Sequence, residues 1–428
     1  MKTAQGTLVI ANGQLIDGTG VKPIANGMVH VVDGKITYAG SAANAPAAPP
    51  KARRIDAQGG TIMPGLVEAH FHATYFNVAA LEDLDIKYPV EYVTLLAASN
   101  CKLLLECGYT AARSGGSLFN VDVWLKKAIE NDIVPGPRLA ASGREICGVG
   151  GLMDWNPDFR KIGMEGLVLL VNGPDESRAA VRKLVKDGVE WVKTYPTGDA
   201  AAPDANDHHT LCMTFDEMNA CVATAHNHGV KITGHCRANA GIKNALRAGY
   251  DAIEHGTFMD VEALDLLMVR NTPVIPALRF ELASIERGPD FGMPQRIIDG
   301  HIECLEGGAE SARRILKAGG RIGMGGDFGF AWNSHGEYAK ELIFFVNYVG
   351  FSPLQTITCA TKIGAEIMGR GHEFGTLEAG KLADILIVDG DVLADIAILE
   401  DRSRILAVLQ GGILKAGRLL AQAQPSVN

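Results

Sequence analysis

The segment Pro64-Gly65-Leu66-Val67-Glu68-Ala69-His70-Phe71-His72 places two histidines one residue apart at the end of an apolar run. In a β-strand, residues i and i+2 point to the same side. We therefore expect His70 and His72 to reach one metal ion from a single strand, while Phe71 faces the opposite way into packing. Because such pairs also occur by chance on protein surfaces, the meaning of this one depends on the rest of the chain.

Four later segments end in the same kind of group. Each is an apolar run that finishes in a side chain able to bind a metal: Val189-Glu190-Trp191-Val192-Lys193, Val230-Lys231-Ile232-Thr233-Gly234-His235, Ala252-Ile253-Glu254-His255 and Ile322-Gly323-Met324-Gly325-Gly326-Asp327. Imidazole nitrogen and carboxylate oxygen suit zinc and similar divalent ions, and a catalytic site keeps one coordination position open for water. The repeated pattern predicts a catalytic metal centre.

The chain around these segments alternates strands with amphipathic helical stretches, which is typical of βα units and a parallel sheet. The pattern predicts strands near residues 64–70, 108–114, 137–143, 189–195, 230–236, 250–256, 272–278 and 321–327. Eight βα units predict a closed barrel, in which catalytic groups sit at the C-terminal ends of the strands. All the candidate ligands fall at such ends.

The ordered set His-x-His, Lys, His, His and Asp resembles the amidohydrolase superfamily, in the subtype with a two-metal site bridged by a carboxylated lysine. Residues 108–113 resemble the family's second barrel strand, and residues 375–384 its C-terminal signature. The chain looks most similar to the prolidase-like and imidazolonepropionase-like group that includes ochratoxinase. This resemblance implies an α/β fold, a (β/α)8 TIM barrel with a small β-sandwich domain formed by both termini. The implied boundaries are 1–62 and 375–428 for the two parts of the sandwich and 63–374 for the barrel.

The resemblance also implies two divalent metal ions, expected to be zinc. His70, His72 and Asp327 would hold the first, His235 and His255 the second, and Lys193 would span both. A free ammonium cannot bind a metal, but a lysine that has taken up carbon dioxide becomes a carbamate with two oxygens. The alternative for Lys193 is a snorkelling or salt-bridged side chain.

The implied reaction is attack by a hydroxide that the two metals share, while one ion polarises the substrate carbonyl. Asp327 would take the proton from the hydroxide and deliver it to the leaving amine. It would therefore act both as a ligand and as a proton carrier.

Substrate-binding residues are sought close to the ligands. Tyr195 and Arg237 each follow a ligand by two residues, so alternation turns them toward the pocket if their strands continue that far. The guanidinium fork of Arg237 suits a carboxylate, with an ordinary rim salt bridge as the alternative. His335 matches a recurrent family position after the eighth strand, where a supporting role and simple packing are both open.

One stretch departs from the group. Relatives often have Gly-Gly-His-Gly-Asp after the third strand, whereas this chain has Gly150-Gly151-Leu152-Met153-Asp154. Leu152 in place of an imidazole makes the pocket more apolar there. Together with Trp155, Phe328 and Phe330, it favours a substrate with an apolar or aromatic group, although such residues are usually core.

Composition excludes several classes of protein. Hydrophobic residues make up 47% of the 428 residues and charged residues 21%, an ordinary globular balance. The net charge of -9, without clustered Lys and Arg, argues against a nucleic-acid partner. The eight cysteines lack paired spacing, and no run is long enough for a transmembrane helix. As given, the chain is expected in the cytoplasm, or secreted or periplasmic if a signal peptide has been removed.

The preferred function is metal-dependent hydrolysis of the amide bond of an N-acyl amino acid or dipeptide-like substrate, including ochratoxin A-type aryl amides of phenylalanine. A cyclic-amide hydrolase or deaminase is a second possibility, although one-metal relatives usually lack the lysine of the fourth strand. A non-catalytic scaffold on the same fold is a third. The partner is expected to be a small-molecule amide and the protein a homo-oligomer, without nucleic acid or membrane.

Overall fold

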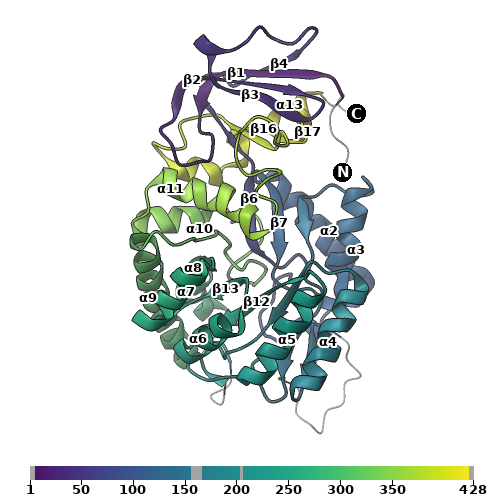
Figure 1. Cartoon of the computed structure of the whole chain (residues 1–428), viewed down its shortest axis with the longest axis vertical. Coiled ribbons are helices and arrows are strands. Elements are labelled where there is room, and N and C mark those ends of the chain that lie inside the picture. The colour runs from purple at the N-terminus through teal and green to yellow at the C-terminus, as the bar shows by residue number, and fades with distance from the viewer. Residues whose placement is uncertain (1–4, 156–165, 203–205, 424–428) are drawn as a thin grey trace.

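The computed structural model describes residues 5–155, 166–202 and 206–423. A sheet built from both ends of the chain lies at one end of the molecule, and a barrel of strands surrounded by helices lies at the other (Figure 1). The predicted barrel with a small β domain from both termini is confirmed, and the strands expected to form a β-sandwich are joined in one sheet.

The terminal strands form one sheet in the order β17-β16-β15-β5-β1-β2-β3, with β4 paired to β1. They are β1 (Thr7–Leu15), β2 (Ile24–Val32), β3 (Lys35–Ser41), β4 (Arg53–Asp56), β5 (Thr61–Pro64), β15 (Ile385–Val388), β16 (Ile405–Gln410) and β17 (Ile413–Ala416). The antiparallel pairing of β15 with β5 joins the two ends of the chain. The predicted boundary at residue 62 falls inside β5, so the domain limits stay a prediction.

The barrel strands are β6 (Leu66–Phe71), β7 (Tyr109–Ser114), β8 (Arg138–Ala140), β11 (Trp191–Thr194), β12 (Lys231–Cys236), β13 (Ala252–His255) and β14 (Val274–Ile275). Neighbours pair in parallel from β6 to β8 and from β11 to β14. Their residues are almost all buried, because one face lines the barrel and the other lies under helices.

Hydrogen bonds outside these ladders close the barrel. The Trp191 amide donates to the carbonyl of Ala141, which joins β11 to the end of β8. The eighth predicted strand, 321–327, is a bridged segment rather than a regular strand: Ile322 pairs with Val274, and Met324 accepts from the amide of Ala69 in β6. The C-terminal ends of all eight segments therefore meet around one opening.

Helices cover the outside of the barrel (Figure 1). They are α1 (Asp83–Ile86), α2 (Val90–Glu106), α3 (Val121–Glu130), α4 (Pro174–Asp187), α5 (Phe215–Asn227), α6 (Asn239–Ala248), α7 (Val261–Arg270), α8 (Leu278–Arg287), α9 (Gln295–Lys317), α10 (Ala339–Phe344), α11 (Pro353–Thr358) and α12 (Gly364–Ile367). The last helix, α13 (Arg418–Ala423), lies instead on the terminal sheet, against β16 and β17. A capping box of Thr214 and Glu217 starts α5 and so defines the end of the long loop after β11.

Two strands of the barrel region lie outside the eight predicted segments. β9 (Glu145–Gly148) and β10 (Val168–Val171) pair in parallel after β8, and Ile146 of β9 also bridges Thr194 at the end of β11. This extension brings Glu145 to the open end of the barrel. The eight cysteines are buried free thiols. Over the described ranges, we find no helix with the length and apolar character to cross a membrane.

Candidate metal centre

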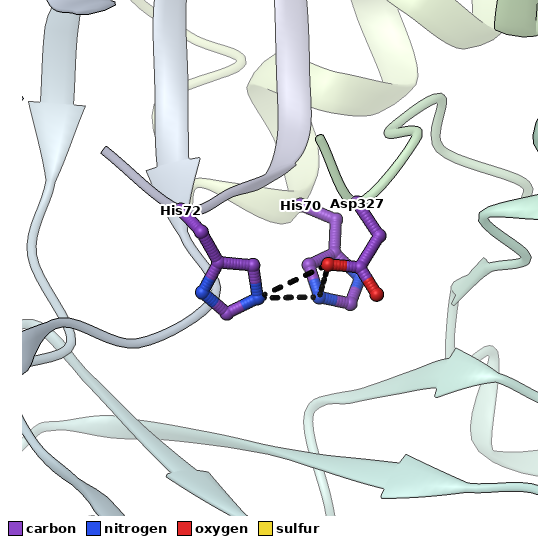
Figure 2. A group of neighbouring side chains, drawn as sticks. All are labelled: His70, His72 and Asp327. Carbon is purple, nitrogen blue, oxygen red and sulfur yellow. Dashed lines mark hydrogen bonds and ion pairs between the residues drawn. The ribbon is translucent and has the colours of Figure 1, made fainter. Parts of the chain in front are cut away.

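His70 of β6, His72 just beyond the end of that strand and Asp327 of the eighth segment converge, as Figure 2 shows. The Nε2 atoms of His70 and His72 are 3.1 Å apart. Asp327 Oδ1 lies 3.8 Å from Nε2 of His70 and 3.4 Å from Nε2 of His72. All three residues are buried. The predicted first ligand set is thus assembled at one point.

These separations suit ligands of one ion. Two atoms that each lie about 2.0–2.1 Å from a tetrahedral zinc stand about 3.3 Å apart. Among the described residues, Asp327 Oδ1, His70 Nδ1 and both ring nitrogens of His255 are buried without a hydrogen-bond partner. Because unpaired buried polar atoms are costly, atoms of this kind fit a site that binds a cation.

The imidazoles are held neutral, as metal ligation requires. Burial lowers the pKa of His72 to about 3 and that of His235 to about 3. Burial also lowers the pKa of His70 and His255. At neutral pH their lone pairs are therefore available to a metal.

His235 and His255 lie next to the first set, at the ends of β12 and β13. Their ring centroids are 4.4 Å apart, and the ring of His255 lies 5.4 Å from that of His70. The five predicted protein ligands other than Lys193 therefore form a continuous cluster.

Lys193 reaches the same cluster from β11, as a salt-bridged lysine. Its Nζ donates to Glu254, a buried carboxylate that lies one residue before His255. Glu254 also accepts from Arg113 Nη2 at 2.5 Å, and its Oε2 lies 3.9 Å from Nε2 of His70. Burial favours a high pKa for Glu254, but the charges of Lys193, His70 and Arg113 outweigh it and hold the pKa well below its usual range.

Strict alternation along β13 would turn the side chain of Glu254 away from the ligands. The sequence therefore does not predict Glu254 as a residue of the site. His255 instead has φ 64°, in the left-handed region. The turn lets adjacent residues both face the barrel interior. The signal in the sequence was the Glu-His pair itself, a charged residue inside an apolar run.

Asp327 adopts a left-handed conformation as well, with φ 52°. Such backbone strain in a non-glycine residue costs about 1–3 kcal/mol and persists only where neighbours enforce it. Asn333 does so here: its Nδ2 donates to the carbonyls of Gly326 and Asp327 at 2.8 and 3.0 Å. Burial, aided by the negative charge of Glu254 and opposed by Lys193, raises the pKa of Asp327 to about 7.

Glu145 is a second carboxylate that the sequence did not indicate. It accepts from the hydroxyl of Tyr195 at 2.6 Å and lies 3.8 Å from Nδ1 of His72. Burial raises the pKa of Glu145 to about 8, although Lys193 opposes the shift. The ring of Tyr75 stacks on His72 with centroids 4.0 Å apart. These contacts orient His72, as supporting groups commonly do for metal-binding histidines.

A cavity of about 440 Å³ opens over the cluster. Its floor includes the candidate ligands His70, His72, Lys193, His235, His255 and Asp327. Its walls are mainly apolar and aromatic: Leu152, Met153, Trp155, Phe280, Phe291, Met293, Phe330 and Trp332. The predicted residues Leu152 and Tyr195 both line it, and so does Arg296 of α9.

The other two predicted substrate residues lie elsewhere. His335 contacts the Tyr75 carbonyl and the Tyr338 hydroxyl, at 3.0 and 2.9 Å, and does not line the cavity. Its position fits support of the Tyr75 backbone.

Arg237 does not line the cavity either, contrary to expectation. The strand β12 ends at Cys236, so alternation no longer sets the direction of the next side chain. Arg237 is buried and pairs with Asp199 at 2.5 Å and Glu281 at 2.7 Å. Its charge is thus balanced by two carboxylates of the protein.

A family model for the amidohydrolase family matches residues 61–414. The chain belongs to the amidohydrolase family. The match spans the barrel, the ligand cluster and most of the C-terminal strands, so the expected family resemblance is confirmed.

Individual relatives agree with this membership. The chain is 26% identical to the ochratoxinase of Aspergillus niger over 444 residues, which cover 97% of this chain and 87% of that one. A solved Xaa-Pro dipeptidase with methionine bound in its active site is 28% identical, with a TM-score of 0.84 over 96% of this chain and 99% of that one. A 5-methylthioadenosine/S-adenosylhomocysteine deaminase of Symbiobacterium thermophilum is 27% identical over 418 residues, or 90% of this chain and 85% of that one. The family and these relatives establish hydrolase chemistry on small molecules.

Proposed function

We propose that this amidohydrolase cleaves the amide bond of N-acyl amino acids or dipeptide-like substrates in a two-metal reaction. One observation carries the proposal: the ligand cluster at the open end of the barrel forms the floor of an apolar cavity, and Arg296 is among the described residues that line it. A cavity of this size lies within the range of about 300–1,000 Å³ that is usual for small-molecule sites.

In this proposal, His70, His72 and Asp327 hold one divalent ion, and His235 and His255 hold the other. Divalent ions, expected to be zinc, supply a polarised substrate carbonyl and an activated water when bound. Lys193 would first release its ammonium proton, and its neutral amine would add carbon dioxide with loss of a second proton, which gives a carbamate that would supply oxygen ligands. Glu254 would then lose Lys193 as a cation but keep Arg113, its partner at 2.5 Å.

Asp327 holds the proton during the reaction. Burial raises the pKa of Asp327 to about 7, and a cation held beside it would lower that pKa, so the carboxylate would be ionised and able to accept a proton near neutral pH. Its carboxylate faces the histidines and lines the cavity, so it can pass a proton from water to the leaving nitrogen. Asn333 keeps the carboxylate in place through the backbone.

The cavity wall supports an amino-acid leaving group with a bulky side chain. Arg296 lines the cavity from α9 and offers a guanidinium there, with its Nη2 donating to the Ala202 carbonyl at 3.0 Å. We assign it, rather than Arg237, as the anchor for the substrate carboxylate. Phe330 packs against Phe280 and Trp332, with ring centroids 4.8 and 5.6 Å apart, and forms an aromatic surface for the apolar group.

Metal analysis combined with a substrate screen tests this function. Protein purified without chelator should contain two divalent ions per chain and hydrolyse N-acyl amino acids and dipeptides with aromatic leaving residues. Ochratoxin A belongs in the screen because it is an aryl amide of phenylalanine. Saturation at one ion, or no amide hydrolysis across the panel, would contradict the proposal. Light scattering of the same preparation measures the homo-oligomer expected from the resemblance.

A deaminase is the second candidate, supported by the relative from Symbiobacterium thermophilum. Ammonia release from 5-methylthioadenosine or S-adenosylhomocysteine distinguishes the two. A deaminase would release ammonia and leave the N-acyl amino acids intact. If the purified protein binds no metal and hydrolyses neither the N-acyl amino acids and dipeptides nor the two adenosine compounds, the non-catalytic scaffold is favoured.

A further inference from the structure

A second group of metal-binding side chains lies outside the ligand cluster. His208 and His209 belong to the loop that leads from β11 to α5, and Glu303 belongs to α9. One nitrogen from each histidine and one oxygen of Glu303 lie within 4.8 Å of one another. The three residues therefore connect a loop with a helix that is distant in the sequence.

The atoms are spaced as ligands of a single ion would be. His208 Nε2 is 3.0 Å and His209 Nε2 is 3.6 Å from the same oxygen, Oε2 of Glu303. These values bracket the separation of about 3.3 Å expected for two ligands of a tetrahedral zinc. A simple surface ion pair needs only one histidine on that oxygen, whereas here two histidines approach it.

The surroundings hold the two rings in place. His208 is only 8% exposed, and the ring of Phe258 lies 5.6 Å from its ring and 4.8 Å from that of His209, between centroids. Within the described part of the chain, Nδ1 of His208 is a buried polar atom without a hydrogen-bond partner. The hydrogen bond from His208 lowers the pKa of Glu303, so this carboxylate is ionised at neutral pH.

The group faces a second cavity, of about 620 Å³, which gives an ion and its water access to solvent. His209 and Glu303 have side chains that are 57% and 62% exposed. Arg296 lines both this cavity and the one over the ligand cluster. An ion here would therefore tie the loop to α9 at the mouth of the proposed substrate site.

We propose that His208, His209 and Glu303 bind a further divalent transition-metal ion, with water completing the coordination. Two imidazoles and a carboxylate form a ligand set that suits zinc and also accepts cobalt or nickel. The site is independent of the proposed function, since none of its residues belongs to the ligand cluster.

Zinc titration of protein whose ligand cluster is already loaded tests the site. Equilibrium dialysis with elemental analysis should show one more zinc per chain in the wild-type protein than in His209→Ala or Glu303→Gln. Because changes in supporting residues alone cost about 10–100-fold in metal affinity, loss of a direct ligand should weaken the additional site at least tenfold. Cobalt gives a second readout, because the visible absorption of the additional ion should disappear in both variants.

His226→Ala is the matched control. His226 is also an exposed histidine paired with a carboxylate, Asp251, at 2.9 Å. Among the described residues, this pair is not joined by a third metal-binding side chain. We expect this variant to bind zinc as the wild type does. Equal zinc binding in the wild type and all three variants, or no additional zinc in the wild type, would overturn the proposal. Since both altered side chains are exposed, thermal melting should show that the variants remain folded.

Discussion

Asp327 combines a strained backbone, a buried carboxylate and a position beside two histidines. Asp327→Asn keeps an oxygen for the metal but cannot carry the proton. We expect at least one ion to remain bound while kcat falls roughly 10²–10⁴-fold, the usual contribution of general acid–base catalysis. Elemental analysis and steady-state kinetics on one preparation measure both. A metal-loaded variant with near-normal kcat would assign the proton transfer to another group.

Two arginines near the site can be separated by mutation, because one lines the cavity and the other is paired inside the protein. Arg296→Ala should raise KM for a free-acid substrate roughly 10- to 100-fold more than for its methyl ester. The difference corresponds to one charge-assisted hydrogen bond of about 1.5–3 kcal/mol. Arg237→Ala serves as the comparison and should affect acid and ester alike, since it removes a buried cation that pairs with Asp199 and Glu281 of the protein itself. A selective loss for the acid in Arg237→Ala would reverse the assignment.

The position of a lysine along its strand determines whether the side chain lies at the ligand cluster. Lys193 ends the apolar run of β11 and is buried beside Glu254, whereas Lys231 starts β12 at the opposite end of the barrel. Lys193→Ala should lose metal and activity together, and short-chain carboxylates should restore part of both by replacing the carbamate oxygens. Lys231→Ala should retain both. Full activity in Lys193→Ala would remove the bridge from the mechanism.

Glu341 links helices that lie after the seventh and eighth barrel segments. From α10, its carboxylate accepts from the backbone amides of Leu278 and Arg279 at 3.2 and 2.7 Å, at the start of α8. Burial raises its pKa from 4.5 to about 8, although these two amides oppose the shift. The buried carboxyl of Glu341 therefore makes the free energy of unfolding of the whole protein depend on pH.

Between pH 4.5 and 8, folded Glu341 keeps a proton that the unfolded chain has released. The free energy of unfolding should therefore fall as pH rises through this window, by up to about 1.4 kcal/mol per pH unit for one proton. Glu341→Gln removes this proton, so its urea midpoint should fall less between pH 6 and pH 8 than that of the wild type. If the urea midpoints of the two proteins fall equally between pH 6 and pH 8, the pKa of Glu341 is not raised.

Much of the architecture was predictable because parallel barrels follow local rules. Apolar runs that end in His70, His72, Lys193, His235 and Asp327 mark strands whose C-terminal ends must meet. The structure brings those side chains together, and their roles as metal ligands remain the proposal made above. The sequence also predicts a strand over residues 321–327. In the structure this segment is irregular and joins the barrel through its pairing with Val274 and Ala69.

The sequence by itself determined the barrel, the family and the positions of the candidate ligands, since these depend on periodicity and on residues at strand ends. Only the tertiary structure decided which charges meet. Glu254 contacts Lys193 and Arg113 because the left-handed turn at His255 breaks the alternation. Arg296, far along the chain on α9, lines the cavity, whereas Arg237 does not line it and is buried in ion pairs with Asp199 and Glu281. Contacts of this kind join distant segments, and local patterns carry no information about them.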